Sequence, residues 1–241
     1  MMSMLILAIA SQKGGVGKTT LAVNLGVELY RQKVRVVVID MDAQGSATYA
    51  LGLIPNEQAG FERWLAGEDV LSTRTAVPLI PGGADTAYIE WRSPDILARA
   101  IARLDAELVL LDCPPSLVPS TVAALVTAHR VLVPVLADPL VLMGLAQILD
   151  TLTDVNPKAK VDVVRSKYKV QLKMTTEADE MLVADPRFNL LRICIPDNVA
   201  IAESAGHGIP VKDYAGGSKG AKAFKAIASE VIKEWGLKHG K

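Results

Sequence analysis

Short apolar runs recur along the chain, and most of them are followed by a turn and then by a segment of helical period. A continuous apolar run bounded by Gly, Pro or Asp is typical of a strand that is buried on both faces of a sheet. The pattern predicts seven strands, at Leu5–Ser11, Val34–Asp40, Ala76–Pro81, Leu108–Asp112, Val131–Leu136, Val161–Arg165 and Leu190–Ile195.

Apolar residues at helical spacing follow several of these runs. Thr19–Gln32 carries Leu21, Leu25 and Leu29 four residues apart, and Leu140–Leu152 reads as a second helix. A third stripe lies near the end of the chain, at Ala221, Phe224, Ala228, Val231, Ile232 and Trp235. Strands that alternate with helices indicate an α/β fold, a doubly wound, mostly parallel sheet with helices on both faces. Because we find no linker or internal repeat, we expect one domain over residues 1–241.

Composition and charge narrow the class of protein. Half of the residues are apolar and mean hydropathy is +0.28, which excludes a disordered chain and a coiled-coil rod. Lys plus Arg and Asp plus Glu both number 26, which excludes a uniformly basic nucleic-acid-binding protein. Basic residues outnumber acidic ones after residue 155, so the C-terminal third can still present a positive surface.

The strongest chemical signal is a glycine-rich loop between the first strand and the first helix. Glycines that allow close approach, backbone N–H groups and a helix N-terminus together bind phosphate. Lys18 can reach the terminal phosphates, and the Thr19 hydroxyl can ligate Mg²⁺. The match to G-x-x-x-x-G-K-[ST] is imperfect because Gln12 takes the first Gly position. The predicted nucleotide-binding residues are Lys13, Gly14, Gly15, Val16, Gly17, Lys18, Thr19 and Thr20.

Three spaced motifs resemble those of one family, the ParA/MinD ATPases. SQKGGVGKTT, with its extra Lys13, resembles the deviant Walker A loop of that family. VVVIDMDAQGSAT (Val36–Thr48) resembles its switch I segment, and LVLLDCPPSL (Leu108–Leu117) resembles its Walker B strand and switch II. The resemblance covers residues 5 to 235 and implies the deviant Walker A type of P-loop NTPase fold.

The resemblance also implies roles for particular residues. Lys13 crosses a dimer interface to the nucleotide of the partner, where a second cation offsets phosphate charge, so Lys13 and Lys18 are expected to assist catalysis. Asp42 orients the attacking water, and Asp40 supports the Mg²⁺ shell. Asp40 and Asp42 lie two residues apart at a strand end, so their side chains are expected to point the same way. Asp112 follows four apolar residues, where a nearby Mg²⁺-bound water removes the cost of an unpartnered carboxylate. Thr19, Asp40 and Asp112 are the expected metal residues.

The expected function follows from the same resemblance. No N-K-x-D or T-K-x-D motif follows a late strand, so adenine is inferred and the expected cofactors are ATP and Mg²⁺. The resemblance implies a ParA-type partition ATPase that forms an ATP-bound homodimer, binds DNA nonspecifically and hydrolyses ATP slowly to segregate or position a plasmid, chromosome or other large cargo. A ParB-like partner or cargo adaptor would stimulate hydrolysis. The alternatives are an ATP-dependent metabolic enzyme on the same scaffold and a nucleotide-gated protein-binding module without DNA binding.

Lysine patterns indicate where DNA would bind. Lys219, Lys222 and Lys225 share roughly one face of the last predicted helix, which suits nonspecific contact with DNA phosphates. The alternative explanation is that these lysines only form a solvent-exposed face of the helix and bind no DNA. A second basic cluster consists of Lys158, Lys160, Arg165, Lys167, Lys169 and Lys173. The family often has an arginine for DNA contact in an I-P-R-N-V segment, but here Asp197 takes that place.

The remaining signals bear on location. Cys113 and Cys194 form neither a disulfide framework nor a C-x-x-C motif, which favours a reducing cytoplasm, with nucleoid association when ATP is bound. An iron–sulfur cluster, as in the nitrogenase iron protein of the same superfamily, needs exposed thiolates, whereas both cysteines lie in apolar runs.

No apolar run approaches the ~20 residues that a helix needs to span a bilayer. The segment after Trp235 is too short and polar for a membrane anchor, so no membrane partner is expected.

Overall fold

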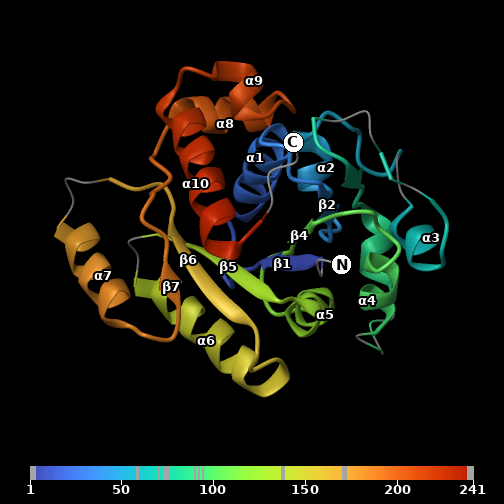
Figure 1. The fold of residues 1–241 in the computed structure, drawn as a ribbon, viewed down its shortest axis with the longest axis horizontal. Coiled ribbons are helices and arrows are strands. Elements are labelled where there is room, and N and C mark those ends of the chain that lie inside the picture. The colour runs from blue at the N-terminus through green and yellow to red at the C-terminus, as the bar shows by residue number, and fades with distance from the viewer. Residues whose placement is uncertain are drawn as a thin grey trace.

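The computed structural model describes residues 4–57, 60–69, 71–72, 76–89, 91, 93, 95–136, 139–169 and 173–237. Within these residues one sheet of parallel strands has the order β3-β2-β4-β1-β5-β6-β7 (Figure 1). Its strands are β1 Leu5–Ile9, β2 Val36–Asp40, β3 Leu79–Ile80, β4 Leu108–Asp112, β5 Arg130–Val135, β6 Lys160–Arg165 and β7 Asn189–Leu190. Each strand overlaps one of the seven predicted runs, and the predicted parallel sheet is confirmed.

The last strand is much shorter than its apolar run predicts. The Leu191 amide bonds to the Val163 carbonyl and the Ile195 amide bonds to the Arg165 carbonyl, so four residues here span two residues of β6. The carboxylate of Glu230 accepts hydrogen bonds from the intervening amides of residues 192 and 193. The chain therefore bulges toward Glu230 after β7, as extra residues in a strand do.

Helices follow most of the strands. Their bounds are α1 Lys18–Arg31, α2 Ser46–Ala50, α3 Phe61–Leu65, α4 Asp95–Ile101, α5 Pro119–Thr127, α6 Pro139–Val155, α7 Lys173–Ala184, α8 Val199–Gly206, α9 Val211–Ala215 and α10 Lys219–Trp235, with a 3₁₀ helix at Ala84–Tyr88. The predicted helices correspond to α1, α6 and α10. The first helix begins and ends one residue earlier than predicted, with Gly17 as its N-cap.

Two apolar cores lie on opposite faces of the sheet. Along β1, Ile6 and Ala8 belong to one core, and Leu7 and Ile9 belong to the other. The helices α1 and α10 cover one face, and α4, α5 and α6 cover the other (Figure 1). The doubly wound architecture predicted from the sequence is therefore confirmed.

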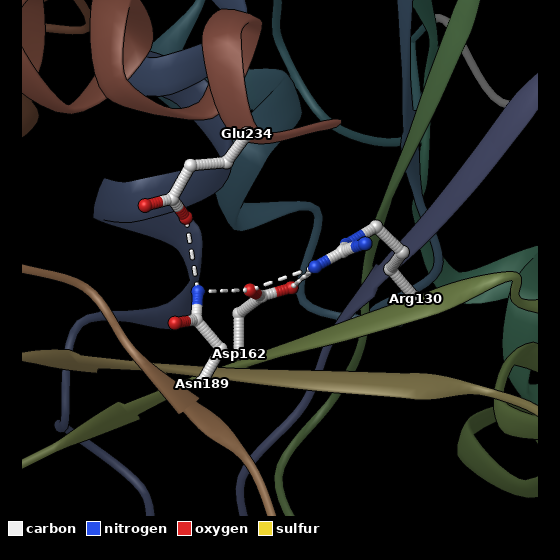
Figure 2. A network of polar contacts seen from close by, with 4 residues as sticks. All are labelled: Arg130, Asp162, Asn189 and Glu234. Carbon is white, nitrogen blue, oxygen red and sulfur yellow. Dashed lines mark hydrogen bonds and ion pairs between the residues drawn. The ribbon is translucent and has the colours of Figure 1, made fainter. Parts of the chain in front are cut away.

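A buried polar network fixes the end of α10 to the sheet (Figure 2). The Arg130 guanidinium donates two hydrogen bonds, of 2.8 and 2.9 Å, to the fully buried carboxylate of Asp162. The Asn189 side-chain amide donates to Asp162 and to Glu234 of α10, at 2.9 Å each. Arg130 also lies 5.2 Å from the ring centroid of Trp235. Breaking the buried Arg130–Asp162 pair, which joins β5 to β6, would typically cost about 3–5 kcal/mol. The end of α10 is attached to this pair through Asn189 and through the ring of Trp235.

The sheet order places a crevice at the carboxyl ends of its central strands. β1 pairs with β4 on one side and with β5 on the other, so the direction of winding reverses at β1. In the register, Asp112 pairs with Ile9 of β1 and with Asp40 of β2. Ligands of open α/β sheets bind outside the carboxyl ends of the strands at such a reversal. The glycine-rich loop, Asp40 and Asp112 all lie there.

Candidate functional site

The glycine-rich loop joins β1 to α1 in a conformation that its glycines permit. Gly15 and Gly17 have φ angles of +74° and +100°, in the left-handed region that other residues rarely adopt. The Gly17 carbonyl accepts the first bond of α1, from the Leu21 amide at 2.9 Å. The N–H groups of the first turn of a helix have no partner within the helix, so they favour the binding of an anion. Val16 is fully buried and anchors the loop in the core.

A cavity of about 410 Å³ opens in front of this loop. Residues of the glycine-rich loop line one part of it, and residues from segments late in the chain line another part. Its lining includes Gly14, Gly15, Gly17, Lys18, Thr19, Thr20, Asp42, Ser46, Pro115, Ser166, Lys167, Pro196, Asp197, Asn198 and Ile201. Six of the eight expected loop residues, all but Lys13 and Val16, therefore meet Asp42 at one cleft, together with residues that the sequence pattern did not assign to it.

Lys18 is held at the floor of the site. Its side chain is only 7% exposed, and burial lowers its pKa. The negative charge of Asp112 opposes this effect, with smaller contributions from Cys113 and Asp42. A buried ammonium that faces carboxylates at the start of a helix suits the binding of a multiply charged phosphate.

Asp112 is a buried carboxylate of the site whose negative charge is poorly compensated. It is fully buried, and neither carboxylate oxygen has a hydrogen-bond partner in the described part of the chain. Burial raises its pKa well above the ordinary value, and the charge of Asp40 raises it further. The nearby Thr19 hydroxyl and Lys18 only partly offset these effects. Mg²⁺ prefers oxygen ligands and would remove the cost of the unpartnered carboxylate, so Thr19 and Asp112 fit a Mg²⁺ ion.

Asp40 is equally buried but has partners. One of its oxygens accepts from the Asp42 amide at 3.1 Å, and the other accepts from the amide and hydroxyl of Thr48 at 2.8 and 2.7 Å. Burial raises its pKa to about 6, although these hydrogen bonds lower it. Asp40 therefore ties residues 42–48 to the end of β2, and Asp112 has the free acceptor capacity. The metal role expected for Asp40 stays a prediction.

Asp42 lies beyond the end of β2 and lines the cleft in a half-buried position. One carboxylate oxygen accepts from the Gln44 amide at 2.9 Å. The strand ends at Asp40, so the alternation of side chains that predicted a common direction for Asp40 and Asp42 does not extend to Asp42. The two carboxylates consequently have different surroundings, one within the protein and one at the cleft.

Sequence reasoning missed two residues that complete the Asp40 anchor. The Thr48 hydroxyl accepts a hydrogen bond from the Gly82 amide at 2.9 Å while it donates to Asp40. A Cβ at Gly82 would lie 2.6 Å from the Asp40 carbonyl oxygen, so only glycine fits there. The Gly82-Gly83 pair after β3 was the available signal of such a close approach.

The remaining expected residues are placed as follows. Lys13 is half-buried, and it precedes the exposed Gly14 and Gly15. Lys219, Lys222 and Lys225 are exposed on one side of α10, whose other side is buried against the sheet. The roles of these lysines stay predictions.

The second basic cluster does not form one surface. Arg165 bonds to Asp179 at 2.7 Å, and Lys169 pairs with Asp197 at 2.8 Å. Lys167 donates to the Gly15 carbonyl of the phosphate loop at 2.9 Å. At least three of its six members are therefore engaged with other parts of the protein, two of them at the nucleotide cleft.

In the described part of the chain the cysteines and acidic groups form no separate metal site. Cys113 is buried, and Cys194 is half-buried beside the Arg165 guanidinium. Within the described ranges no three His, Cys, Asp or Glu side chains are grouped to hold a metal ion. A Mg²⁺ ion at Thr19 and Asp112 would therefore depend on phosphate oxygens as further ligands, as is usual for this ion. The described helices also include none that is long and apolar enough to cross a membrane.

Comparison with known proteins agrees with this geometry. The family model described as the CobQ/CobB/MinD/ParA nucleotide binding domain matches residues 7–211. The chain is 36% identical over 237 residues to the chromosome-partitioning ATPase Soj of Thermus thermophilus, covering 94% of each chain. It is 33% identical over 249 residues to the chromosome partitioning protein ParA of Caulobacter vibrioides, covering 94% of this chain and 93% of the relative.

A solved structure has the same fold with a nucleotide in place. It is that of cobyrinic acid a,c-diamide synthase from Mycobacterium smegmatis with bound ADP and magnesium. The TM-score is 0.80 at 28% sequence identity, and the similarity covers 99% of this chain and 100% of that chain.

Proposed function

Because the chain belongs to the ParA/MinD family and is a ParA-type ATPase that uses ATP and Mg²⁺, we propose that it is a partition ATPase. In this proposal two copies close around two ATP molecules, bind DNA nonspecifically and release it after slow hydrolysis. The cargo is a plasmid, a chromosome or another large body, and a ParB-like partner or cargo adaptor stimulates hydrolysis. Residues 1–241 act as one domain in the cytoplasm, on nucleoid DNA when ATP is bound, without a membrane partner.

The observation that carries the proposal is the cleft at which the phosphate loop and Asp42 meet, with the buried Asp112 beside Lys18. The amides of Gly14–Gly17 cradle the phosphates, and Lys18 neutralises their charge. Thr19 and Asp112 would hold the Mg²⁺ ion, whose charge offsets that of the phosphate oxygens. Asp42 orients the attacking water from the open side of the cleft.

Dimer closure is proposed at the face that carries Lys13. Gly14 and Gly15 are exposed, so another chain can approach the phosphate loop closely there. A Cβ at either glycine would meet nothing within 4 Å, which leaves space in front of the loop. In the closed dimer Lys13 of each copy contacts the nucleotide of the other copy.

DNA binding is proposed at the face formed by Lys219, Lys222 and Lys225. These ammonium groups are exposed at three-residue spacing, and such a face suits contacts with phosphates rather than bases. Asp197, which stands where the family often has arginine, is paired with Lys169. The pair already engages the Lys169 ammonium, so the 195–198 segment offers DNA phosphates no unpaired cation there, which favours the exposed lysine face of α10 as the DNA contact.

Cosedimentation with DNA in ATP, ADP or a nonhydrolysable ATP analogue tests this function. We expect DNA binding with ATP and the analogue, little with ADP, and a steep loss with salt because phosphate contacts release counterions. The combined Lys219→Gln, Lys222→Gln and Lys225→Gln variant should bind DNA at least tenfold more weakly and show a smaller salt slope.

A matched control removes three exposed basic residues away from α10, by Arg99→Gln, Lys158→Gln and Lys160→Gln. It changes net charge equally, so we expect DNA binding close to wild type. Equal losses in the two triple variants would mean that only net charge matters and would refute the lysine face. Absence of DNA binding in every nucleotide state would refute the partition function itself.

Lys18→Met tests the phosphate site. The side chain keeps most of its length and loses its charge, so we expect ATP and ADP to bind at least about a hundredfold more weakly, as befits a buried charge-assisted contact. Isothermal titration calorimetry measures the affinity. Because burial lowers the pKa of Lys18, the folded protein should be at least as stable to heat as wild type without nucleotide. Unchanged nucleotide affinity would contradict the assignment of Lys18.

A second candidate function is an ATP-dependent synthase. The name of the solved mycobacterial structure favours it, as does a second cavity of about 550 Å³ between α1, α2 and α8 that shares Thr19 and Thr20 with the nucleotide cleft. ATP turnover that requires a small organic substrate and is indifferent to DNA would support the synthase. Hydrolysis that proceeds without any small molecule and rises with DNA and a partner would exclude it, and undetectable hydrolysis under all conditions would leave a nucleotide-gated binding module.

A further inference from the structure

A short segment after β6 crosses the nucleotide cleft. We call residues Ser166–Lys169 the strap. Lys167 within it has a φ angle of +48°, a left-handed conformation that is uncommon for a residue with a side chain. Such conformations persist where the surrounding contacts determine them, and they occur often at functional sites. Here the contact is between the Lys167 ammonium and the Gly15 carbonyl oxygen, at 2.9 Å across 152 residues of sequence.

This contact bears directly on the phosphate loop. Gly15 has a positive φ, and its neighbour Gly14 also lacks a side chain, so the backbone here has few steric restraints of its own. The peptide unit is planar and trans, so its carbonyl and its N–H point in opposite directions. When Lys167 holds the Gly15 carbonyl, it therefore also turns the Val16 N–H away from the strap. The lysine thus fixes the direction of a donor in the loop that binds phosphate.

The strap is also joined to the other side of the cleft. The Tyr168 amide donates to the Ile195 carbonyl at 2.9 Å, and the Asp197 amide approaches the Tyr168 carbonyl at 3.4 Å. The Lys169 ammonium pairs with the Asp197 carboxylate at 2.8 Å. Lys167 and Asp197 both line the nucleotide cavity. The strap consequently connects the phosphate loop with the 195–198 segment through side chains that flank the cavity.

We propose that Lys167 is a nucleotide-positioning residue of this ATPase, which holds the phosphate loop in its binding conformation through the Gly15 carbonyl. The Lys169–Asp197 pair sets the position of the opposite wall, where the nucleoside part of ATP lies. Both lysines therefore serve the nucleotide and not DNA. The inference concerns ATP binding alone and does not depend on the partition function proposed above.

The test compares two ligands, ADP and inorganic pyrophosphate, which lacks a nucleoside. Lys167→Met removes the ammonium, so we expect both ligands to bind about fivefold more weakly, because one solvent-exposed charged hydrogen bond is lost. Lys167→Arg keeps a cation and should restore affinity to within about twofold of wild type. Lys169→Met should weaken ADP about threefold and leave pyrophosphate unchanged. Lys160→Met, at the exposed start of β6, the strand that leads into the strap, is the matched control and should leave both affinities unchanged.

Calorimetry gives both affinities, and the midpoint of thermal unfolding without ligand checks the fold. A Lys167→Met protein that unfolds at the wild-type temperature and binds both ligands as tightly as wild type would overturn the proposal. So would equal weakening in Lys167→Met and Lys160→Met, or no recovery in Lys167→Arg. A loss of affinity for DNA with unchanged affinity for ADP would return Lys167 to the DNA surface and would also overturn it.

Discussion

The Asp112→Asn variant is expected to be more stable to heat than wild type in the absence of nucleotide and to lose the contribution of Mg²⁺ to nucleotide binding. Its carboxylate is buried beside Asp40, and neither oxygen has a hydrogen-bond partner in the described structure. An amide removes the buried charge, and its weaker interactions with the Thr19 hydroxyl and Lys18 offset only part of the gain. We expect a gain in stability at neutral pH, seen as a higher unfolding midpoint, because burial and the charge of Asp40 both disfavour the ionised carboxylate that the variant removes.

The pH dependence gives an independent test of the same group. The pKa of Asp112 is raised in the folded protein, so between its unfolded and folded values the folded state binds a proton that the unfolded state has lost. The stability of the nucleotide-free wild-type protein should therefore fall as pH rises through this range. Asp40, with a pKa of about 6, contributes a fall in the same direction. Asp112→Asn should flatten the curve around neutral pH.

Differential scanning calorimetry with and without ADP and Mg²⁺ measures both effects. In wild type, Mg²⁺ should raise the unfolding midpoint of the ADP complex, and EDTA should reverse the rise. In Asp112→Asn, Mg²⁺ should have little effect. Asp154→Asn, an exposed carboxylate on α6, serves as the control and should behave as wild type. A less stable Asp112→Asn protein, or one with the full response to Mg²⁺, would contradict the metal role of Asp112.

Asp42→Ala is expected to lower ATP turnover by a factor of about 10² or more while ATP still binds. Asp42 lines the cleft, whereas Asp40 and Thr48 hold the surrounding segment through their own bonds. If Asp42 orients the attacking water, as proposed, removing its carboxylate removes the acceptor for that water and leaves the segment attached. With ATP and Mg²⁺ we expect a persistent dimer, because the step that opens it no longer occurs.

Phosphate release and size-exclusion chromatography measure the two effects. Asp42→Asn keeps an oxygen for the Gln44 amide and loses the charge, so it should be as inactive as Asp42→Ala if the charge orients water. Gln44→Ala leaves that backbone bond intact and is the control in the same segment. Wild-type hydrolysis in Asp42→Asn would remove Asp42 from the reaction. Loss of ATP affinity in either variant would assign Asp42 to binding instead.

The sequence predicted the sheet and the phosphate loop because both depend on local patterns. Buried parallel strands need continuous apolar runs, and a phosphate loop needs glycines beside a helix start. Leu21, Leu25 and Leu29 are all fully buried, as their spacing predicted. The shorter helices α2, α3 and α9 have five residues each, too few to show a helical period.

Other features depend on contacts between distant segments, and no local pattern encodes them. β7 ends early because Glu230 on α10 binds the amides of the chain that follows it. Lys167 appeared to belong to a basic cluster, but its left-handed backbone and the position of Gly15 bring it to the nucleotide cleft. The bond from Thr48 to Gly82 likewise joins segments 34 residues apart. The contacts of Lys167 and Thr48 bear on the site, which is why the loop was predicted and its supports were not.

The attachment of α10 has a mechanical consequence. If the lysine face near the start of this helix holds DNA, any tension from a dragged cargo runs along the helix toward its other end. There Glu234 accepts a hydrogen bond from Asn189, which also donates to Asp162, the partner of Arg130, toward the amino ends of β5, β6 and β7 (Figure 2). The nucleotide cleft lies at the opposite, carboxyl edge of the sheet. Part of such a pull would thus be borne by the sheet, and the rest would pass to α1, which packs along α10 and begins at the phosphate loop.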